Sequence, residues 1–124
     1  MDTNVAIDYI GGLLPQKANQ WLDTIVENDI AVSVINKIEI LGFSTEHQED
    51  MLPFEELVAT LELLYVTDNV VNQTIILRKK YKIQLPDAII AATALVYDLT
   101  LLSRNEKDFK RVNGLKWQNL HTIV

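Results

Sequence analysis

The amino-acid sequence predicts a single α/β domain over residues 1–124, with a mainly parallel central sheet. Short apolar segments of strand character alternate with longer stretches of helical period, a pattern typical of strands joined by crossover helices. The chain has 124 residues, of which 48% are apolar, so it is long enough to bury one core. Four glycines and three prolines leave little room for long linkers, and no internal repeat is evident.

Four helices are expected in the N-terminal half. The first covers residues 4–10 and ends at Gly11–Gly12, and the second follows Pro15, because proline suits a first helical turn. Two more are expected near 35–43 and 54–64. Their expected inward faces are Ile35, Ile38 and Leu41 in the former and Leu57, Leu61 and Leu64 in the latter.

Two helices are expected in the C-terminal half. Asp68 is predicted to cap the first, in which Val71, Ile75 and Leu77 recur at helical spacing. Pro86 opens the second, from Asp87 through Asp98. This last helix is apolar nearly all round, so we expect it to be central in the core.

Strands are expected near 30–34, 64–66, 99–102 and 120–124. Residues 1–2 would form the end of a further first strand. Since only Met1 precedes Asp2, either that strand is cut very short or the natural protein starts upstream.

Composition and charge exclude several classes of protein. The formal net charge of −6 weakly disfavours a nucleic-acid binder, although basic residues cluster at 78–82 and at 104–116. The first basic cluster suits a helix C-terminus or a contact with RNA phosphate. Without cysteine there is no disulfide or zinc–thiolate site. No apolar run approaches a membrane span, and no basic segment typical of a signal peptide is present, so we expect a cytoplasmic protein without a membrane partner.

Four acidic residues stand in apolar surroundings: Asp2, Glu39, Asp87 and Asp108. Each has an ordinary alternative. Asp2 could cap a helix, Glu39 could be solvent-exposed, Asp87 could favour a helix N-terminus, and Asp108 could serve a turn. The first and last follow segments of strand character, and ligands in α/β sheets lie at the carboxyl ends of strands. All four can be assigned to that one end, where Glu39 would be half-buried, and a divalent cation would offset their repulsion.

Oxygen ligands without histidine or cysteine favour Mg²⁺ or Mn²⁺ over Zn²⁺. His47 and His121 are poorly placed in the sequence to be ligands. Ser103 and Asn105 would add neutral oxygens at the end of the strand near 99–102.

The chain resembles PIN-domain ribonucleases, and more narrowly the VapC-like toxins of bacterial toxin–antitoxin pairs. The resemblance runs from end to end, through four motifs: Asp2-Thr3-Asn4-Val5, Glu39 in an apolar helix, Leu85-Pro86-Asp87-Ala88, and Ser103-Arg104-Asn105 with Asp108-Phe109. Two positions depart from the usual pattern. The first strand is short, and Ser33 and Asn36 stand where the family often has Thr or Ser before the helix with the Glu.

The resemblance implies a three-layer α/β/α sandwich, often a homodimer, that cleaves RNA with Mg²⁺ or Mn²⁺. By motif position Asp2, Glu39 and Asp87 are the core acids. Asp108 is the favoured fourth acid, with Asn105 as an alternative to it. Thr3, Asn4, Ser103 and Asn105 would be supporting polar groups, and Arg104, Lys107, Lys110 and Arg111 would contact RNA.

A small antitoxin is the expected protein partner. We expect it to cover an apolar surface on the first helices, formed by Val5, Ile7, Tyr9, Ile10, Leu13, Leu14 and Trp21. The main alternative is a degenerate PIN-like module that binds antitoxin or RNA without cleaving. A dehalogenase-like phosphatase would need an acid at Asn4, and a receiver domain would need two adjacent acids after the first strand.

Overall fold

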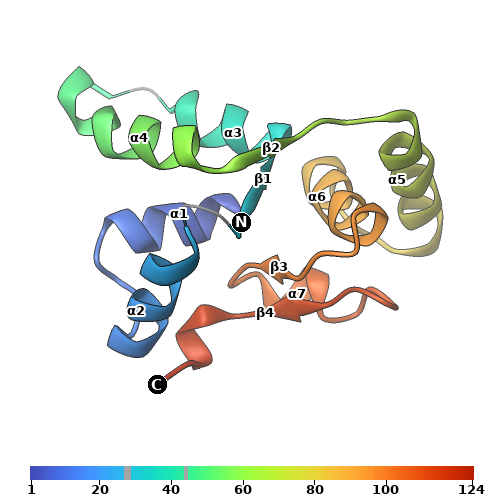
Figure 1. Cartoon of the computed structure of the whole chain (residues 1–124). Coiled ribbons are helices and arrows are strands. Elements are labelled where there is room, and N and C mark those ends of the chain that lie inside the picture. Colours follow the sequence, from blue (N-terminus) through green and yellow to red (C-terminus); the bar gives the residue numbers. More distant parts are fainter. Residues whose placement is uncertain (27–28, 44) are drawn as a thin grey trace.

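The computed structural model describes residues 1–26, 29–43 and 45–124 (Figure 1). Its α-helices are α1 (Thr3–Ile10), α2 (Gln16–Ile25), α3 (Val34–Leu41), α4 (Leu52–Thr60), α5 (Asp68–Lys80), α6 (Leu85–Val96) and α7 (Glu106–Phe109). The strands are β1 (Ala31–Ser33), β2 (Glu62–Leu64), β3 (Leu101–Leu102) and β4 (Trp117–Gln118), and the 3₁₀ helices are η1 (Gln48–Met51) and η2 (Leu120–Thr122). The mixture of helices and parallel strands confirms the predicted α/β class.

The strands form two parallel pairs. In the first, β1 pairs with β2 in the register Ala31 opposite Glu62, and in the second, β3 pairs with β4 in the register Leu101 opposite Trp117. Residues 1–2 are not a strand in the structure, but they join the two pairs. The Met1 ammonium donates to Ala31 O at 2.9 Å, and the Asp2 amide donates to Leu102 O at 2.9 Å.

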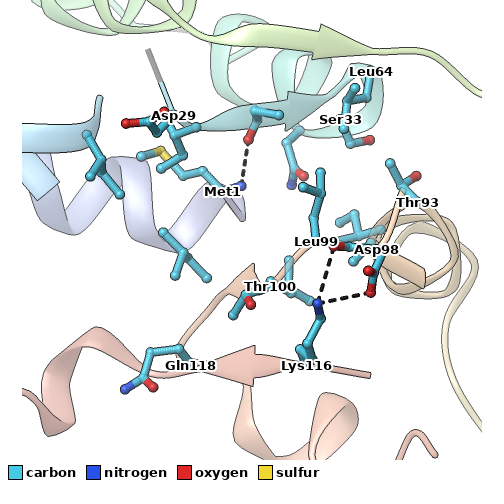
Figure 2. Close-up of a pocket in the computed structure, with 18 of the residues that line it drawn as sticks. Met1, Asp29, Ser33, Leu64, Thr93, Asp98, Leu99, Thr100, Lys116 and Gln118 are labelled. Atoms are coloured by element: carbon cyan, nitrogen blue, oxygen red, sulfur yellow. Dashed lines mark hydrogen bonds and ion pairs between the residues drawn. The ribbon is translucent and has the colours of Figure 1, made fainter. Parts of the chain in front are cut away.

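A cavity of about 500 Å³ lies between the two strand pairs. Figure 2 shows Met1 at its edge, opposite Leu99 and Thr100 from the segment that leads into β3. Lys116 bonds Asp98 across its rim, with Nζ 2.9 Å from a carboxylate oxygen. The chain start therefore lies at the centre of the molecule, beside β1 (Figure 1).

The core consists of two apolar clusters. One gathers α1, α2, β1 and α4 around Leu22, Val32 and Val58, and the other gathers α5, α6, β3 and α7 around Val70, Ala91 and Phe109. Helices α5 and α6 pack side by side (Figure 1). Alanines on the buried face of α6 permit this close approach, and α6 is central in its cluster as the sequence predicted.

Short polar side chains fix where the helices begin. Asp2, Ser33 and Thr67 are the N-caps of α1, α3 and α5, and each accepts a backbone N–H of the first turn. The prediction that Asp68 caps α5 was therefore wrong, because Thr67 takes that position. After α1 the chain turns through Gly12, whose φ of +69° suits glycine.

Other sequence predictions were wrong about which helix faces are buried and where the strands lie. Ile38 and Val71, expected inside, are 62% and 43% exposed, and the buried faces carry Ile40 and Val70 instead. The expected strand at 64–66 lies at 62–64. The expected strand at 120–124 is replaced by β4 and η2. None of the helices in the described ranges combines the length and the apolar character needed to cross a membrane.

Candidate active site

Asp2 stands at the start of α1 and is 6% exposed. Its Oδ1 accepts the Thr3 amide at 2.8 Å and the Asn36 amide group at 3.0 Å. Its Oδ2 accepts the Ser103 hydroxyl at 2.7 Å and the Asn4 amide group at 3.2 Å. Asp2 is thus both the N-cap of α1 and the centre of a polar cluster, so the capping interpretation is confirmed and the role as a metal-binding acid stays a prediction.

Asn36 on α3 lies between two acids. Its Nδ2 is 3.0 Å from Asp2 Oδ1, 3.0 Å from Thr3 Oγ1 and 3.3 Å from Glu39 Oε1. Thr3 also donates its hydroxyl to Glu39 Oε1 at 2.9 Å. Asn36 is 1% exposed, so its donors are directed into the site and offset part of the repulsion between the two carboxylates.

Glu39 is solvent-exposed, whereas we expected it to be half-buried. Helix α3 turns Asn36 and Ile40 inward, which leaves Glu39 at its outer edge. The carboxylate still reaches Thr3 and therefore remains part of the site.

Asp87 lies in the first turn of α6 and is intermediate in exposure. Burial, followed by the charges of Asp2, Asp108 and Glu39, raises its pKa to about 6. The contributions of Asp2, Asp108 and Glu39 mean that each of these three acids lies within electrostatic range of Asp87. The fold therefore brings together residues spaced over more than a hundred positions of the chain.

The loop after β3 supplies the remaining groups. Asn105 donates its amide to Asp108 Oδ2 at 3.1 Å, and its backbone N–H bonds Ser103 Oγ at 3.0 Å. Because Ser103 in turn donates to Asp2, the loop links two of the acids through neutral groups. Both candidates for the fourth ligand, Asn105 and Asp108, thus lie in the site.

The donor set fits a hard divalent cation, since it consists of carboxylate and neutral oxygens. In the part of the chain that the structure describes, no three His, Asp or Glu side chains converge closely enough to hold one ion directly. An ion such as Mg²⁺, which usually keeps several waters, suits carboxylates that are near but not convergent.

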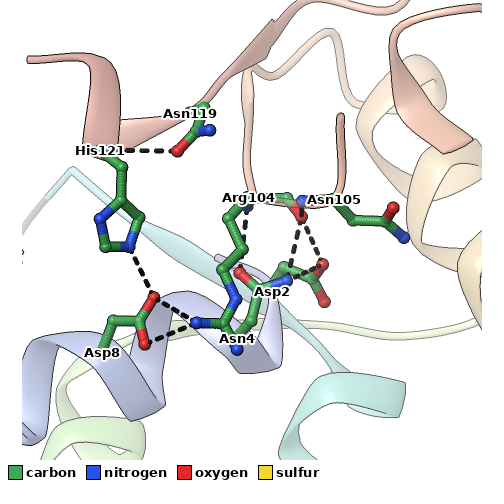
Figure 3. A network of polar contacts seen from close by, with 8 residues as sticks. Asp2, Asn4, Asp8, Arg104, Asn105, Asn119 and His121 are labelled. Atoms are coloured by element: carbon green, nitrogen blue, oxygen red, sulfur yellow. Dashed lines mark hydrogen bonds and ion pairs between the residues drawn. The ribbon is translucent and has the colours of Figure 1, made fainter. Parts of the chain in front are cut away.

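A second buried acid, Asp8, was missed by the sequence analysis. It is 1% exposed, and Arg104 Nη1 lies 3.0 and 3.1 Å from its two oxygens. His121 Nε2 lies 2.8 Å from Oδ2 (Figure 3). Asp8 sits mid-helix among apolar neighbours, which is the only sequence signal that marks it, because its partners lie far along the chain.

The network around Asp8 adjoins the site. Arg104 donates its backbone N–H to Asn4 Oδ1 at 3.2 Å, and Asn4 contacts Asp2 (Figure 3). The Arg104 guanidinium, predicted to contact RNA, is thus held by Asp8. Of the other predicted RNA contacts, Lys107, Lys110 and Arg111 are exposed on or beside α7.

The apolar surface expected on the first helices is smaller than predicted. Val5 is 2% exposed and belongs to the core, and Tyr9, Ile10 and Leu14 are partly buried against it. Three side chains remain largely exposed: Ile7, Leu13 and Trp21 at 47%, 64% and 41%.

Comparisons with known proteins identify the family and support the fold. A family model described as PIN domain matches residues 1–115. A toxin–antitoxin complex from Klebsiella pneumoniae contains a chain 32% identical, with 92% of each chain covered and a TM-score of 0.71. VapBC-1 from nontypeable Haemophilus influenzae is 26% identical, with 96% of this chain and 95% of that one covered and a TM-score of 0.77.

A further structure supports the fold alone. VapBC2 from Rickettsia felis, bound to a DNA fragment from its promoter, is 24% identical, with 95% of each chain covered and a TM-score of 0.80. No curated protein matches the chain.

Proposed function

The chain belongs to the PIN domain family, and on that premise we propose that it is a metal-dependent endoribonuclease, the toxin of a toxin–antitoxin pair. The observation that carries the proposal is the group of Asp87 with three further carboxylates, whose charges add to the larger effect of burial in raising the pKa of Asp87. A site of this charge repels phosphate unless a cation is present. The similar structures described as VapBC or toxin–antitoxin complexes support the assignment as a toxin.

Asp2, Glu39, Asp87 and Asp108 would hold Mg²⁺ or Mn²⁺, which supplies an activated water and neutralises charge on the scissile phosphate. Polar side chains of the protein hold two of these carboxylates in place by hydrogen bonds. Thr3, Asn4, Asn36 and Ser103 orient the Asp2 carboxylate, and Asn105 orients Asp108. Such hydrogen bonds keep the first ligands from rotating, as outer-shell partners do in metal sites. Lys107, Lys110 and Arg111 would offset the negative charge where RNA approaches.

One experiment tests the proposal directly. A pool of RNA is incubated with the protein while Mn²⁺ is titrated, and a chelator is then added. We expect cleavage that rises with Mn²⁺ and stops with the chelator. The proposal fails if the pool stays intact at every Mn²⁺ concentration.

A second candidate function is binding without cleavage. The observation that favours it is the Asp2 carboxylate, whose two oxygens accept four donors from the protein itself. A carboxylate has about four lone-pair sites, so a cation would compete with these donors. An intact RNA pool together with stable binding of RNA or antitoxin would support this alternative.

The proposed antitoxin would cover Ile7, Leu13 and Trp21, the exposed apolar side chains on and beside α1 and α2. An amphipathic helix would suit this patch, and a basic side chain from it could pair with the acids. Part of the surface could instead form a homodimer. Co-expression with the adjacent small reading frame tests the partner: a protein that elutes alone and fully active would rule it out.

A further inference from the structure

A second concave region of the surface lies beside the acids. It has a volume of about 670 Å³ and runs between the α5–α6 connection and α7. We call this region the basic groove. Its walls include Arg78, Tyr81, Lys82, Lys107, Asp108 and Arg111. The groove joins the two basic clusters of the sequence, which lie some thirty residues apart along the chain.

The charge of the basic groove is opposite to that of the whole protein. Four cationic side chains and one carboxylate line it, although the chain carries a formal net charge of −6. Like charges repel when they are held together on one wall. The groove therefore favours an anionic occupant, and its electrostatic attraction acts close to the acids.

Two of the cations are held in place by backbone carbonyls. Arg78 Nη1 donates to Ile83 O at 2.8 Å, and Arg111 Nη2 donates to Lys82 O and lies 3.6 Å from Asp108 Oδ1. A guanidinium has five N–H donors, so each arginine keeps donors for a further acceptor. Both side chains are thus ordered before any ligand arrives, which lowers the entropy lost on binding.

Tyr81 supplies an aromatic wall. Its hydroxyl accepts the Asn113 amide at 2.9 Å, and Lys80 Nζ lies 5.5 Å from the ring centroid. The hydroxyl bond ties the ring to the loop after α7. Basic grooves with an aromatic side chain are typical of single-strand nucleic-acid binding, because bases stack on the ring while phosphates contact the cations.

The groove leads directly to the acids. Asp108 forms part of its wall, and the wall residue Gln84 is the N-cap of α6, whose first turn carries Asp87. A strand lying in the groove would therefore bring its next phosphate to two of the four acids.

We propose that the basic groove binds single-stranded RNA next to the scissile position, with phosphates on Arg78, Lys82, Lys107 and Arg111 and a base stacked on Tyr81. The proposal rests on the proposed ribonuclease function, because it extends the same site to the neighbouring nucleotides.

The test measures binding of a fluorescent single-stranded oligouridylate by anisotropy, in chelator, so that the probe stays intact. Lys82 and Lys107 are replaced together by glutamine. We expect about tenfold weaker binding and a salt dependence shallower by about 1.4, since each single-strand phosphate contact contributes about 0.7 to the slope. The matched control replaces Lys17 and Lys37, which lie outside the groove and outside both basic clusters, by glutamine, which makes the same change in net charge. The control should bind like the wild type.

A second pair of variants tests the stacking. Tyr81→Ala should weaken binding by about tenfold with an unchanged salt slope, whereas Tyr81→Phe, which keeps the ring, should bind like the wild type.

Three results would overturn the proposal: equal loss in the two double-lysine variants, equal binding of duplex and single-stranded RNA, or tight binding of polyglutamate without binding of the oligouridylate. The last result would assign the groove to an acidic protein segment. Because binding is measured without cleavage, a wild type that binds the oligouridylate but does not cleave RNA would contradict the ribonuclease proposal and not the proposal that the groove binds RNA. If the wild type cleaves RNA and the groove variants bind the oligouridylate as tightly as the wild type does, only the proposal that the groove binds RNA is contradicted.

Discussion

Asp8 and Asp87 are both at least partly buried, but the protein gives the first an arginine and a histidine as partners and the second further acids. Arg104 and His121 bond Asp8 from two sides. Asp87 instead faces Asp2, Asp108 and Glu39, and with burial these raise its pKa to about 6. A carboxylate with built-in counter-charges contributes to the fold, whereas one left among like charges requires an external cation. The comparison distinguishes Asp8, an acid paired within the fold, from the four acids that we propose to be functional.

The largest expected effect concerns activity. Replacing Asp87 with Asn should reduce RNA cleavage by about a thousandfold, because one charged ligand of the proposed cation is lost. The matched control is Asp98→Asn, which removes the same charge from an exposed residue, and asparagine tolerates the φ of +53° at that position. Rates are measured on one RNA pool at fixed Mn²⁺. Cleavage by the Asp87 variant at a rate close to that of the control would place the chemistry elsewhere.

The next effect concerns stability and belongs to Asp8. Asp8→Asn should lower the free energy of unfolding by about 3 kcal/mol, because Arg104 loses the buried carboxylate with which it pairs and His121 loses a carboxylate hydrogen-bond partner. Denaturant unfolding of the wild type and the variant gives the difference. A loss of only a few tenths of a kcal/mol would mean that water satisfies the half-exposed Arg104 guanidinium, and Asp8 would then not be a structural anchor.

The sequence drew attention to the four candidate acids of the site but not to Asp8. Each of the four acids stands in a recognisable local motif, and the strand ends suggested a common location. Asp8 bonds partners 96 and 113 positions away, so no local pattern reveals the network. The inner faces of α3 and α5 were misjudged for a related reason. Both helices carry aliphatic residues on several sides, and only packing against α4 and α6 decides which side is buried.

The strands were the least predictable elements. Each has two or three residues, which is too short for an alternating pattern to appear. The β-branched residues near the C-terminus suggested a strand, but Asn119 accepts the His121 amide at 3.0 Å and starts a 3₁₀ turn instead.

A smaller change in stability is expected for Asp87, and it is opposite in sign to the change expected for Asp8. In chelator, Asp87→Asn should raise the free energy of unfolding by about 1–2 kcal/mol at pH 8, because it removes a half-buried charge from a repulsive group. The folded pKa of about 6 exceeds the ordinary 3.8, so the native state holds the proton more tightly. Wild-type stability should therefore fall as pH rises between these values and change little from this group above them. The advantage of the variant should vanish below pH 4, and a pH-independent difference would contradict the electrostatic origin.

Direct binding of Mn²⁺ is the measurement closest to the central claim, that four carboxylates together bind a divalent cation. Calorimetric titration of the wild type, Asp87→Asn and Asp98→Asn requires no RNA and no cleavage. We expect the wild type and Asp98→Asn to bind Mn²⁺ alike and Asp87→Asn to bind at least about tenfold more weakly. Absence of binding by the wild type, or equal binding by all three proteins, would contradict the claim.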